Sequence, residues 1–248
     1  MNTLKNYLGY EITHFNSITS TNTYLMQEAK NGAKNKTVIV ADQQTSGRGR
    51  LGRTFESPDR CGLYVSILLR EVVGFNPTLL TVIAALCVCE SIEDISGKSA
   101  NIKWVNDVYL GAKKVSGILT EGAFFDSELS YAVIGIGVNI AEPEGGFTSQ
   151  ISNIAGAILD SYSANARDEL VRLILTKLDN YISNFDHNYI LNKYREKSII
   201  IGKNVTVYSN GEVFIAKAIS INNDFSLTVT DVKGNEITLK SGEVSIKL

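Results

Sequence analysis

QQTSGRGRLGRTFESP, at residues 43–58, is the stretch from which the rest of this chain can be interpreted. Three glycines in it have the G-x-G-x-x-G spacing found in dinucleotide-binding turns and in the glycine loop of protein kinases. Three arginines alternate with these glycines, and arginine offers forked donors that match phosphate and carboxylate groups. The six residues are Gly47, Arg48, Gly49, Arg50, Gly52 and Arg53. This arginine loop, residues 47–53, suits the binding of an anion.

The residues around the arginine loop exclude the common glycine-rich nucleotide sites. A dinucleotide site needs a helix directly after the glycine turn, but residues 53–62 contain a proline, lack a helical apolar period and lead into a strand. A kinase needs H-R-D and D-F-G motifs, and neither string occurs, nor does the P-loop motif G-x-x-x-x-G-K-S/T. Taken alone, the loop also fits an exposed basic hairpin loop that touches RNA, and this alternative stays open.

The composition is that of a soluble globular protein. The 248 residues, 44% hydrophobic and 20% charged, allow one large domain with a small second one. A net charge of −2 gives no global attraction to nucleic acid. No apolar run could span a membrane and the N-terminal residues lack the apolar core of a signal peptide, so we expect a cytoplasmic protein. Cys61, Cys87 and Cys89 are predicted to be buried thiols, and His14 and His187 to be surface or satisfied core residues.

Apolar periodicity predicts strands and helices up to residue 197 and a different hydrophobic pattern after it. Strands are expected at residues 10–17, 37–44, 62–70, 101–105, 114–125 and 129–140. Helices are expected after a cap at Ser20 or Thr21, from Pro77 to near Gly97, and over residues 151–160 and 166–196, with a loop at residues 141–150. Residues 198–248 alternate with period two between turn signals, which predicts a small all-β module with a boundary near residue 197.

Three further motifs follow the arginine loop. KWVND, residues 103–107, places polar groups at a strand end, and KKVSGILTEG, residues 113–122, places lysines at a strand start. IGIGVN, residues 134–139, has glycines inside a strand, where glycine weakens the ladder unless something approaches the backbone closely. Each motif alone also fits solvated lysines, a turn cap or a bulge.

In this order the motifs resemble those of the biotin–protein ligases, over nearly the whole chain. The family pattern is S-T-N, Q-x-x-G-R-G-R-x-G-R, K-W-P-N-D, K-x-x-G-I-L-x-E and G-x-G-x-N. It matches residues 20–22, 44–53, 103–107, 114–121 and 135–139. The departures are Val105 in place of the usual proline and Phe55 where a tryptophan often occurs. Too few residues precede the first motif to form a DNA-binding helix-turn-helix, so we expect no DNA binding.

The resemblance implies a fold and a reaction. The fold would be α+β: a catalytic domain like that of class II aminoacyl-tRNA synthetases at residues 1–197, with a mixed, largely antiparallel sheet, and a small SH3-like β-barrel at residues 198–248. The enzyme would be an AMP-forming biotin–acetyl-CoA-carboxylase ligase. Biotin and MgATP would give biotinyl-5′-AMP and pyrophosphate, and biotin would then pass to a lysine of a biotin carboxyl carrier protein domain. The resemblance implies no membrane and leaves a homodimer open.

The resemblance also implies roles for residues at the motif positions. The catalytic residues would be Arg48, Arg50, Asn106, Asp107 and Lys114, with Asp107 also holding Mg²⁺. Biotin would contact Ser20, Thr21, Asn22, Gln44, Gly47, Arg48, Lys114, Gly117, Gly135 and Gly137. ATP would contact Arg50, Arg53, Phe55, Lys103, Asn139 and Phe147. The arginine loop and the loop at residues 141–150 would act as lids that keep water from the reactive adenylate.

Two other functions compete with this interpretation. A lipoate– or octanoate–protein ligase shares the fold and the chemistry, but such enzymes tend to carry an R-R-x-S-G-G-G run where this chain has G-R-G-R. A non-catalytic RNA-binding module is disfavoured by the net charge, and because aromatic residues are not interleaved with the basic ones. That alternative also leaves Lys114 and Asp107 without a role.

Overall fold

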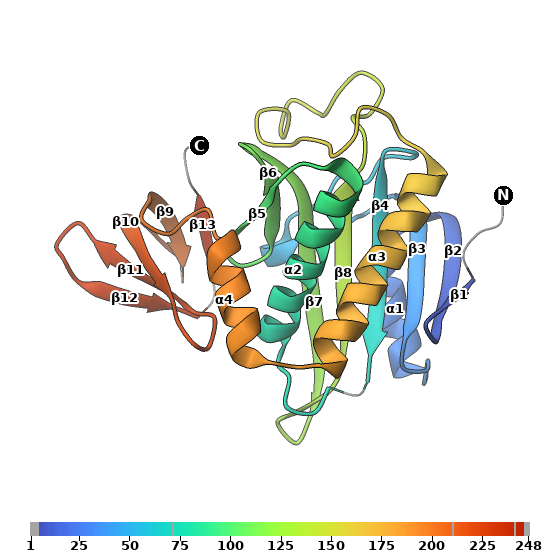
Figure 1. Ribbon diagram of the computed structural model, residues 1–248, viewed down its shortest axis with the longest axis horizontal. Helices are drawn as coiled ribbons and strands as arrows, with labels where there is room; N and C mark the ends of the chain where they lie inside the picture. Colours follow the sequence, from blue (N-terminus) through green and yellow to red (C-terminus); the bar gives the residue numbers. More distant parts are fainter. Residues whose placement is uncertain (1–4, 71, 210, 241, 246–248) are drawn as a thin grey trace.

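The described part of the chain forms an eight-stranded sheet, a five-stranded sheet and four α-helices (Figure 1). The structure, a computed structural model, describes residues 5–70, 72–209, 211–240 and 242–245. Residues 1–4, 71, 210, 241 and 246–248 lie outside the description, and with them the outer ends of both predicted domains. The prediction of an α+β fold with a mixed sheet is confirmed.

The larger sheet is mixed but largely antiparallel. Only β2 and β3 run parallel among its neighbouring strands in the described residues, in the order β1-β2-β3-β4-β8-β7-β6-β5. The strands are β1 Asn6–Tyr7, β2 Tyr10–Ile18, β3 Thr37–Gln44, β4 Gly62–Leu69, β5 Ala100–Lys103, β6 Asp107–Leu110, β7 Lys113–Phe125 and β8 Glu128–Asn139. The strand predicted at residues 101–105 ends earlier, because Trp104 and Val105 begin the turn into β6.

Helices cover both faces of this sheet. α1 (Thr21–Lys30) packs on one face, while α2 (Pro77–Ser96) and α3 (Ala164–Ser183) pack on the other, and α4 (His187–Lys197) lies beside α2 (Figure 1). Side chains cap all four helix starts: Ser20 caps α1, Asn76 caps α2, Ser163 caps α3 and Asp186 caps α4. The helix predicted over residues 166–196 is in fact two helices, because α3 ends at Ser183 and a new helix begins after the cap Asp186.

The smaller sheet follows α4 and is antiparallel throughout. Its order is β12-β11-β10-β9-β13. The strands are β9 Asn204–Ser209, β10 Glu212–Ile221, β11 Leu227–Asp231, β12 Glu236–Leu239 and β13 Glu243–Ser245. Hydrogen bonds connect this part of the chain to the rest: Trp104 Nε1 donates to Phe225 O over 2.9 Å, and Arg195 Nε and Nη2 donate to Ile221 O over 2.8 and 2.5 Å. Arg50 Nη2 donates to Gly242 O over 3.1 Å. The small sheet is thus held against α4 and the turn between β5 and β6.

The prediction of a helix at residues 151–160 is wrong, because this segment consists of turns. Its apolar residues recur at helical spacing, but only a single turn forms at Ile151, and the next backbone groups bond to strands. Lys114 N donates to Ile154 O and Gly156 N donates to Lys114 O, over 2.7 and 2.9 Å. Ile158 N donates to Asn139 O over 3.1 Å. The segment is therefore fixed along the ends of β7 and β8.

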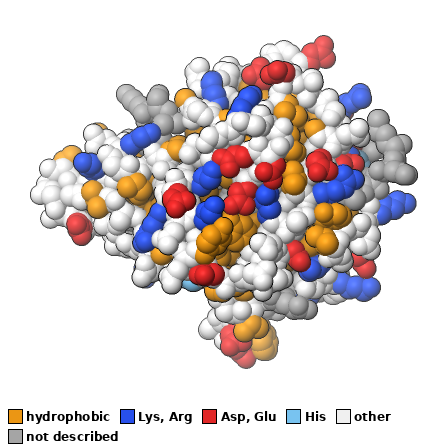
Figure 2. Space-filling model, in the orientation of Figure 1, with side chains coloured by type: hydrophobic (Ala, Val, Ile, Leu, Met, Phe, Trp, Pro, Cys, Tyr) orange, Lys and Arg blue, Asp and Glu red, His pale blue; other side chains and the backbone are white. Residues whose placement is uncertain are grey.

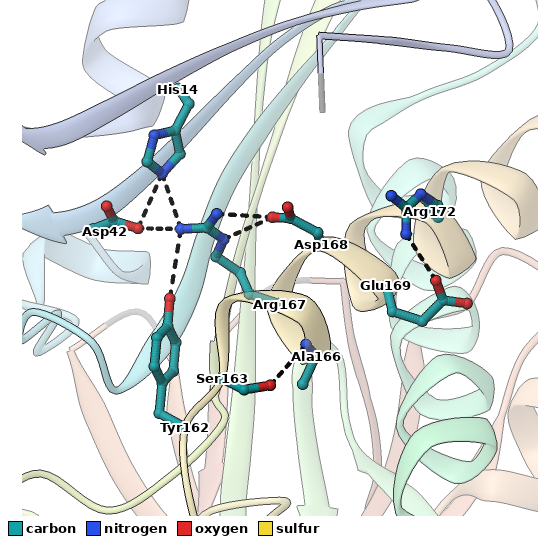
Figure 3. Close-up of polar contacts among 9 residues, drawn as sticks. All are labelled: His14, Asp42, Tyr162, Ser163, Ala166, Arg167, Asp168, Glu169 and Arg172. Carbon is teal, nitrogen blue, oxygen red and sulfur yellow. Dashed lines mark hydrogen bonds and ion pairs between the residues drawn. The ribbon is translucent and has the colours of Figure 1, made fainter. Parts of the chain in front are cut away.

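A cluster of mostly buried polar side chains ties the start of α3 to β2 and β3 (Figure 3). Arg167 lies at its centre, 5% exposed, and its guanidinium contacts Asp42, Asp168 and Tyr162. His14 Nε2 lies 3.0 Å both from Asp42 Oδ1 and from Arg167 Nη1. The prediction that His14 is a satisfied residue is confirmed. The three cysteines are also buried and free, as predicted.

Charges of both signs are interspersed on the face that carries α2 and α3 (Figure 2). Many of them are paired across helices: Lys177 Nζ lies 2.9 Å from Asp94 Oδ2, and Lys197 Nζ lies 2.5 Å from Glu93 Oε1. Among the described residues, this face therefore shows no basic surface of the kind that nucleic acid selects. Among the described helices, none combines the length and the apolar character needed to cross a membrane.

Candidate active site

A pocket lies against the start of α1, on the face of the larger sheet that α1 covers. It is lined by the start of α1, the arginine loop, the turn between β5 and β6, strands β7 and β8, and Gly242. Most of the predicted site residues line it. They are Ser20, Thr21, Asn22, Gln44, Arg48, Arg50, Arg53, Phe55, Lys103, Asn106, Asp107, Lys114, Gly117, Gly135 and Gly137. The structure thus brings together residues from all five motifs, at residues 20–22, 44–53, 103–107, 114–121 and 135–139.

The strand register explains why the motifs meet. Asp107 on β6 lies opposite Gly117 on β7, and Gly117 lies opposite Gly137 on β8. Neighbouring strands are about 4.8 Å apart, so these three positions form one short row across the sheet. The motifs KWVND, KKVSGILTEG and IGIGVN each contribute one residue to that row. The three motifs are separate in the sequence but adjacent in space, because β6, β7 and β8 are consecutive antiparallel strands.

At one end of the pocket a network of hydrogen bonds fixes the side chain of Gln44. Its Oε1 accepts from Thr21 N over 2.9 Å and from Thr21 Oγ1 over 3.0 Å. Its Nε2 donates to Ser57 Oγ over 2.8 Å, and Ser57 Oγ donates to Phe55 O over 3.0 Å. Ser66 Oγ lies 2.8 Å from Thr21 Oγ1. Because both ends of the Gln44 amide have protein partners, its orientation is set before any ligand arrives.

Glycines in the pocket floor allow other side chains to approach the backbone of the sheet closely. A Cβ on Gly135 would lie 2.1 Å from Asn22 Oδ1, and a Cβ on Gly137 would lie 2.4 Å from the Phe55 ring. The same ring lies 3.4 Å from the Cβ position of Gly117. The space over Gly135 and Gly137, two of the residues predicted to contact biotin, is therefore taken by the Asn22 amide and the Phe55 ring. These glycines let two protein side chains pack on the sheet.

Two lysines hold one carboxylate at the other end of the pocket. Lys114 Nζ lies 2.7 Å from Asp107 Oδ1, and Lys103 Nζ lies 3.2 Å from Asp107 Oδ2. Lys103 and Asp107 are each 8% exposed. Burial alone would raise the pKa of Asp107, but the charges of Lys114 and Lys103 outweigh it, so the pKa lies below its ordinary value. Asp107 is therefore a carboxylate at neutral pH.

Magnesium does not fit at Asp107 in this arrangement. Both carboxylate oxygens contact ammonium groups, whereas Mg²⁺ is usually held by one or two carboxylates together with substrate phosphates. In the described part of the chain no group of three or more His, Cys, Asp or Glu side chains could hold a metal ion. The prediction of Asp107 as a magnesium ligand is accordingly not carried further.

The arginine loop folds as a small hairpin over the pocket. Arg48 pairs with Thr54 across an antiparallel bridge, and Gly49 N donates to Arg53 O over 2.7 Å. Arg50 Nη1 donates to Asn106 Oδ1 over 2.9 Å, and its Nη2 donates to Gly242 O over 3.1 Å. The hairpin is thereby connected both to the KWVND turn and to the segment that enters β13.

Three predicted residues do not line the pocket. Gly47 is buried beneath the hairpin, where a Cβ would lie 2.3 Å from Phe55 O. Asn139 Nδ2 donates to Gly156 O over 3.0 Å, so its side chain holds the turns that follow the 141–150 loop. Phe147 lies in that loop outside the pocket. Thr148 Oγ1 nevertheless donates to Glu56 Oε1 over 2.5 Å, which joins this loop to the segment after the arginine loop.

The sequence model of the biotin/lipoate A/B protein ligase family matches residues 14–139, which include all the residues that line the pocket except Gly242. This chain belongs to that family. Among relatives of this biotin/lipoate ligase, the bifunctional ligase/repressor BirA of Bacillus subtilis is 28% identical over 232 residues, covering 92% of this chain and 71% of the relative. The biotin–acetyl-CoA-carboxylase ligase of Mycobacterium tuberculosis is 28% identical over 236 residues, covering 91% and 85%.

A solved structure of similar fold supports the same assignment. The biotin protein ligase of Aquifex aeolicus, in complex with biotin and ATP, superposes with a TM-score of 0.78 at 26% identity. The match covers 94% of this biotin/lipoate ligase and 97% of the Aquifex chain. The large sheet, the helices and the small sheet therefore occur together in both proteins.

Sequence reasoning missed several residues around the pocket of this biotin/lipoate ligase. Ser57 and Ser66 complete the hydrogen bonds of Gln44 and Thr21, but an isolated serine carries no motif. Gly242 contributes only its carbonyl oxygen. Apolar walls come from Trp104, Ile118, Leu119 and Ile136. The alternation of strand residues could have indicated Leu119, because it lies two positions from Gly117 on the same face of β7.

Proposed function

We propose that this chain is a biotin–protein ligase. It would activate biotin with MgATP to biotinyl-5′-AMP, release pyrophosphate, and transfer the biotin to a lysine of a biotin carboxyl carrier protein domain. The observation that carries the proposal is one pocket with a fixed polar network at one end and five cationic side chains around the rest. These cations are Arg48, Arg50, Arg53, Lys103 and Lys114. The names of the relatives and the biotin and ATP of the Aquifex complex support it.

Biotin recognition is assigned to the end of the pocket near α1. The ureido ring of biotin is flat and needs hydrogen-bond partners on its edges, and Ser20, Thr21 and Gln44 supply them there. The Gln44 amide is held between Thr21 and Ser57. A donor and acceptor set that is already oriented costs little entropy on binding, which favours affinity. The apolar tail would run along β7 and β8 and displace the Phe55 ring.

The first half-reaction brings two anions together, and the cations offset their repulsion. The carboxylate of biotin must approach the α-phosphate of ATP, which needs fixed positive charge between them. Lys114 is assigned to that position. When Lys114 turns toward the phosphate, Lys103 stays with Asp107, so the carboxylate keeps one counter-charge. Arg50 and Arg53 would contact the phosphates, and Lys103 would contact them through a second N–H while keeping its contact with Asp107.

The second half-reaction requires a neutral amine from the carrier lysine, whose ordinary pKa is about 10.4. Asp107 is assigned as the group that accepts its proton. The pKa of Asp107 is held down by Lys114 and Lys103, and it would rise once Lys114 engages the adenylate. The carboxylate therefore becomes more basic at the stage when a base is needed. The amine attacks the acyl carbon of the adenylate and AMP leaves.

The finer fold assignment belongs to the same proposal. We assign residues 1–197 to a catalytic domain of the class II aminoacyl-tRNA-synthetase type, and residues 198–248 to an SH3-like β-barrel. The end of α4 at Lys197 and the start of β9 at Asn204 support a boundary between them. The small sheet would contribute to the pocket through Gly242.

Biotin-dependent release of pyrophosphate from ATP tests the function. The purified chain should release pyrophosphate with biotin and not with lipoate or octanoate. Lys114→Ala should reduce the rate about 100-fold or more, as loss of a group that stabilises transition-state charge does. Lys113→Ala is the matched control, because Lys113 bonds the carbonyls of Ser152 and Asn153 instead. Release with lipoate or octanoate alone would assign the chain to that branch of the family.

A further inference from the structure

Glu121 on β7 forms a bidentate ion pair with Arg48 of the arginine loop. Arg48 Nη2 lies 2.9 Å from Glu121 Oε1, and Arg48 Nη1 lies 2.9 Å from Glu121 Oε2. A bidentate guanidinium–carboxylate pair is both stronger and more directional than a single contact. Glu121 does not itself line the pocket, whereas Arg48 does. The carboxylate therefore acts on the pocket through the arginine that it holds.

The same carboxylate also holds a residue of the pocket floor. Asn22 Nδ2 donates to Glu121 Oε2 over 3.0 Å and to Leu119 O over 3.2 Å. Asn22 Oδ1 accepts from Ser66 Oγ over 2.6 Å, and its amide fills the space above Gly135. Glu121 on β7 thus orients both Arg48, in the hairpin over the pocket, and Asn22, at the pocket floor.

The pairing changes the role that fits Arg48. Both terminal nitrogens of its guanidinium donate to Glu121, so this end-on pair of donors could bind an anionic ligand only by leaving that carboxylate. Arg48 also begins the hairpin, because it pairs with Thr54 across the loop. Arg50 and Arg53 lie between these two residues. Fixing Arg48 therefore fixes the hairpin that carries the other two arginines.

We propose that Glu121 is a positioning residue of the arginine loop: it anchors Arg48, and through it the hairpin, over the pocket. Arg48 then serves as the attachment of the hairpin, and Arg50 and Arg53 serve as its ligand-facing cations. The effect on substrate binding rests on the proposed ligase function, but the anchoring itself does not. The two parts can therefore be tested separately.

Proteolysis tests the anchoring without any substrate. Trypsin cleaves after arginine, and its access to the loop requires the hairpin to open locally. Glu121→Gln keeps a side chain of the same size and an oxygen for Asn22, but removes the charge that holds Arg48. Cleavage after Arg48, Arg50 or Arg53, located by mass spectrometry, should be about tenfold faster in Glu121→Gln than in the unaltered chain. Cleavage at an unchanged rate would overturn the proposal.

A control variant separates the anchor from a general loss of stability. Glu169 pairs with Arg172 over 3.0 Å on the exposed side of α3, far from the pocket in sequence. Glu169→Gln should leave loop cleavage unchanged. The urea midpoint of each variant is measured alongside. If the faster cleavage of Glu121→Gln simply followed a lower urea midpoint, with all tryptic sites accelerated alike, the anchoring role would be refuted.

Enzyme kinetics test the consequence for substrate binding. Glu121→Gln and Arg48→Gln should each raise the KM for biotin about tenfold, while kcat changes less than KM. Because the two side chains act as one pair, the double variant should show about the same KM as either single variant. A hundredfold rise in the double variant would mean independent roles and would overturn the pairing. If the unaltered chain showed no biotin-dependent pyrophosphate release, the ligase function would fail while the proteolysis result still stood.

Discussion

Replacing Asp107 by Asn probes the buried charges at the base of the pocket. The substitution keeps the size of the side chain and removes its negative charge. Lys103 Nζ, 3.2 Å from Asp107 Oδ2, would then lose its counter-charge in a site where the lysine side chain is 9% exposed. Lys114, whose side chain is 28% exposed, can turn toward water instead. The cost therefore falls mainly on Lys103.

The structure sets the expected size of this effect. Removing one partner of a buried ion pair costs about 3–5 kcal/mol, because the remaining charge is left unpaired. Asparagine still offers an oxygen to Lys103, so we expect the lower end, about 3 kcal/mol. In a chain of this length about 1 kcal/mol lowers Tm by roughly 2–4 °C, so Tm should fall by about 6–12 °C. Lys103→Met in the Asp107→Asn background should restore most of that loss, because it removes the unpaired ammonium group.

Thermal and urea unfolding at pH 7 measure the effect. Asp94→Asn is the matched control, because it is the same substitution in an exposed pair, 2.9 Å from Lys177 Nζ. Exposed pairs contribute about 0–1 kcal/mol. If Asp107→Asn lowered Tm by no more than Asp94→Asn, or if Lys103→Met made the double variant less stable still, the account of a buried and paired Lys103 would be refuted.

The contacts of Asp107 with Lys103 and Lys114 also predict the direction in which the stability of the fold changes with pH. The pKa of Asp107 lies below its ordinary value of 3.8 in the folded chain, so the folded state favours the carboxylate. The pair therefore stabilises the fold at every pH above about 4 and loses this contribution as the pH falls through the folded-state pKa. The stability difference between the unaltered chain and Asp107→Asn should be full at pH 7 and shrink below pH 4.

Two other substitutions test structural features outside the lysine pair. Arg167→Met should lower the free energy of unfolding by about 3 kcal/mol in urea titrations, because it leaves the Asp42 and Asp168 carboxylates without the guanidinium between them; a loss below 1 kcal/mol would contradict this. Gly135→Ala should cost about 1–3 kcal/mol by the same measurement, because the new methyl group would lie 2.1 Å from Asn22 Oδ1. An unchanged midpoint would mean that Asn22 moves aside freely.

Local signals in the sequence predicted the elements of the large sheet well. Val38, Val40 and Leu63 belong to apolar runs whose length and boundaries suit strands, and the pairing of β7 with β8 followed from two long runs beside a short connection. Ser20 caps α1 as expected, because its position before an apolar helical period is itself local information. In these segments the local signal and the observed structure agree.

The errors came from non-local hydrogen bonds. Residues 151–160 have apolar positions at helical spacing, yet the carbonyl of Ile154 and the N–H of Gly156 bond to the backbone of Lys114. The arginine motif predicted cations at one pocket, but the partner of Arg48 depends on the register of β7 that places Glu121 beside it. The spacing of the motifs in the sequence does not determine that register. Site composition was therefore predictable, whereas the pairing of its charges was not.

The contact between Arg50 and Gly242 has a consequence for the order in which the pocket can be assembled during synthesis. All other residues that line the pocket lie at or before Gly137, about a hundred residues ahead of Gly242. At roughly 5–20 residues per second, a ribosome would deliver the last carbonyl partner of Arg50 roughly 5–20 s after the rest. A nascent chain therefore carries an incomplete pocket until Gly242 has been synthesised. Only from that point can both terminal nitrogens of Arg50 have the partners seen here, Asn106 Oδ1 and Gly242 O.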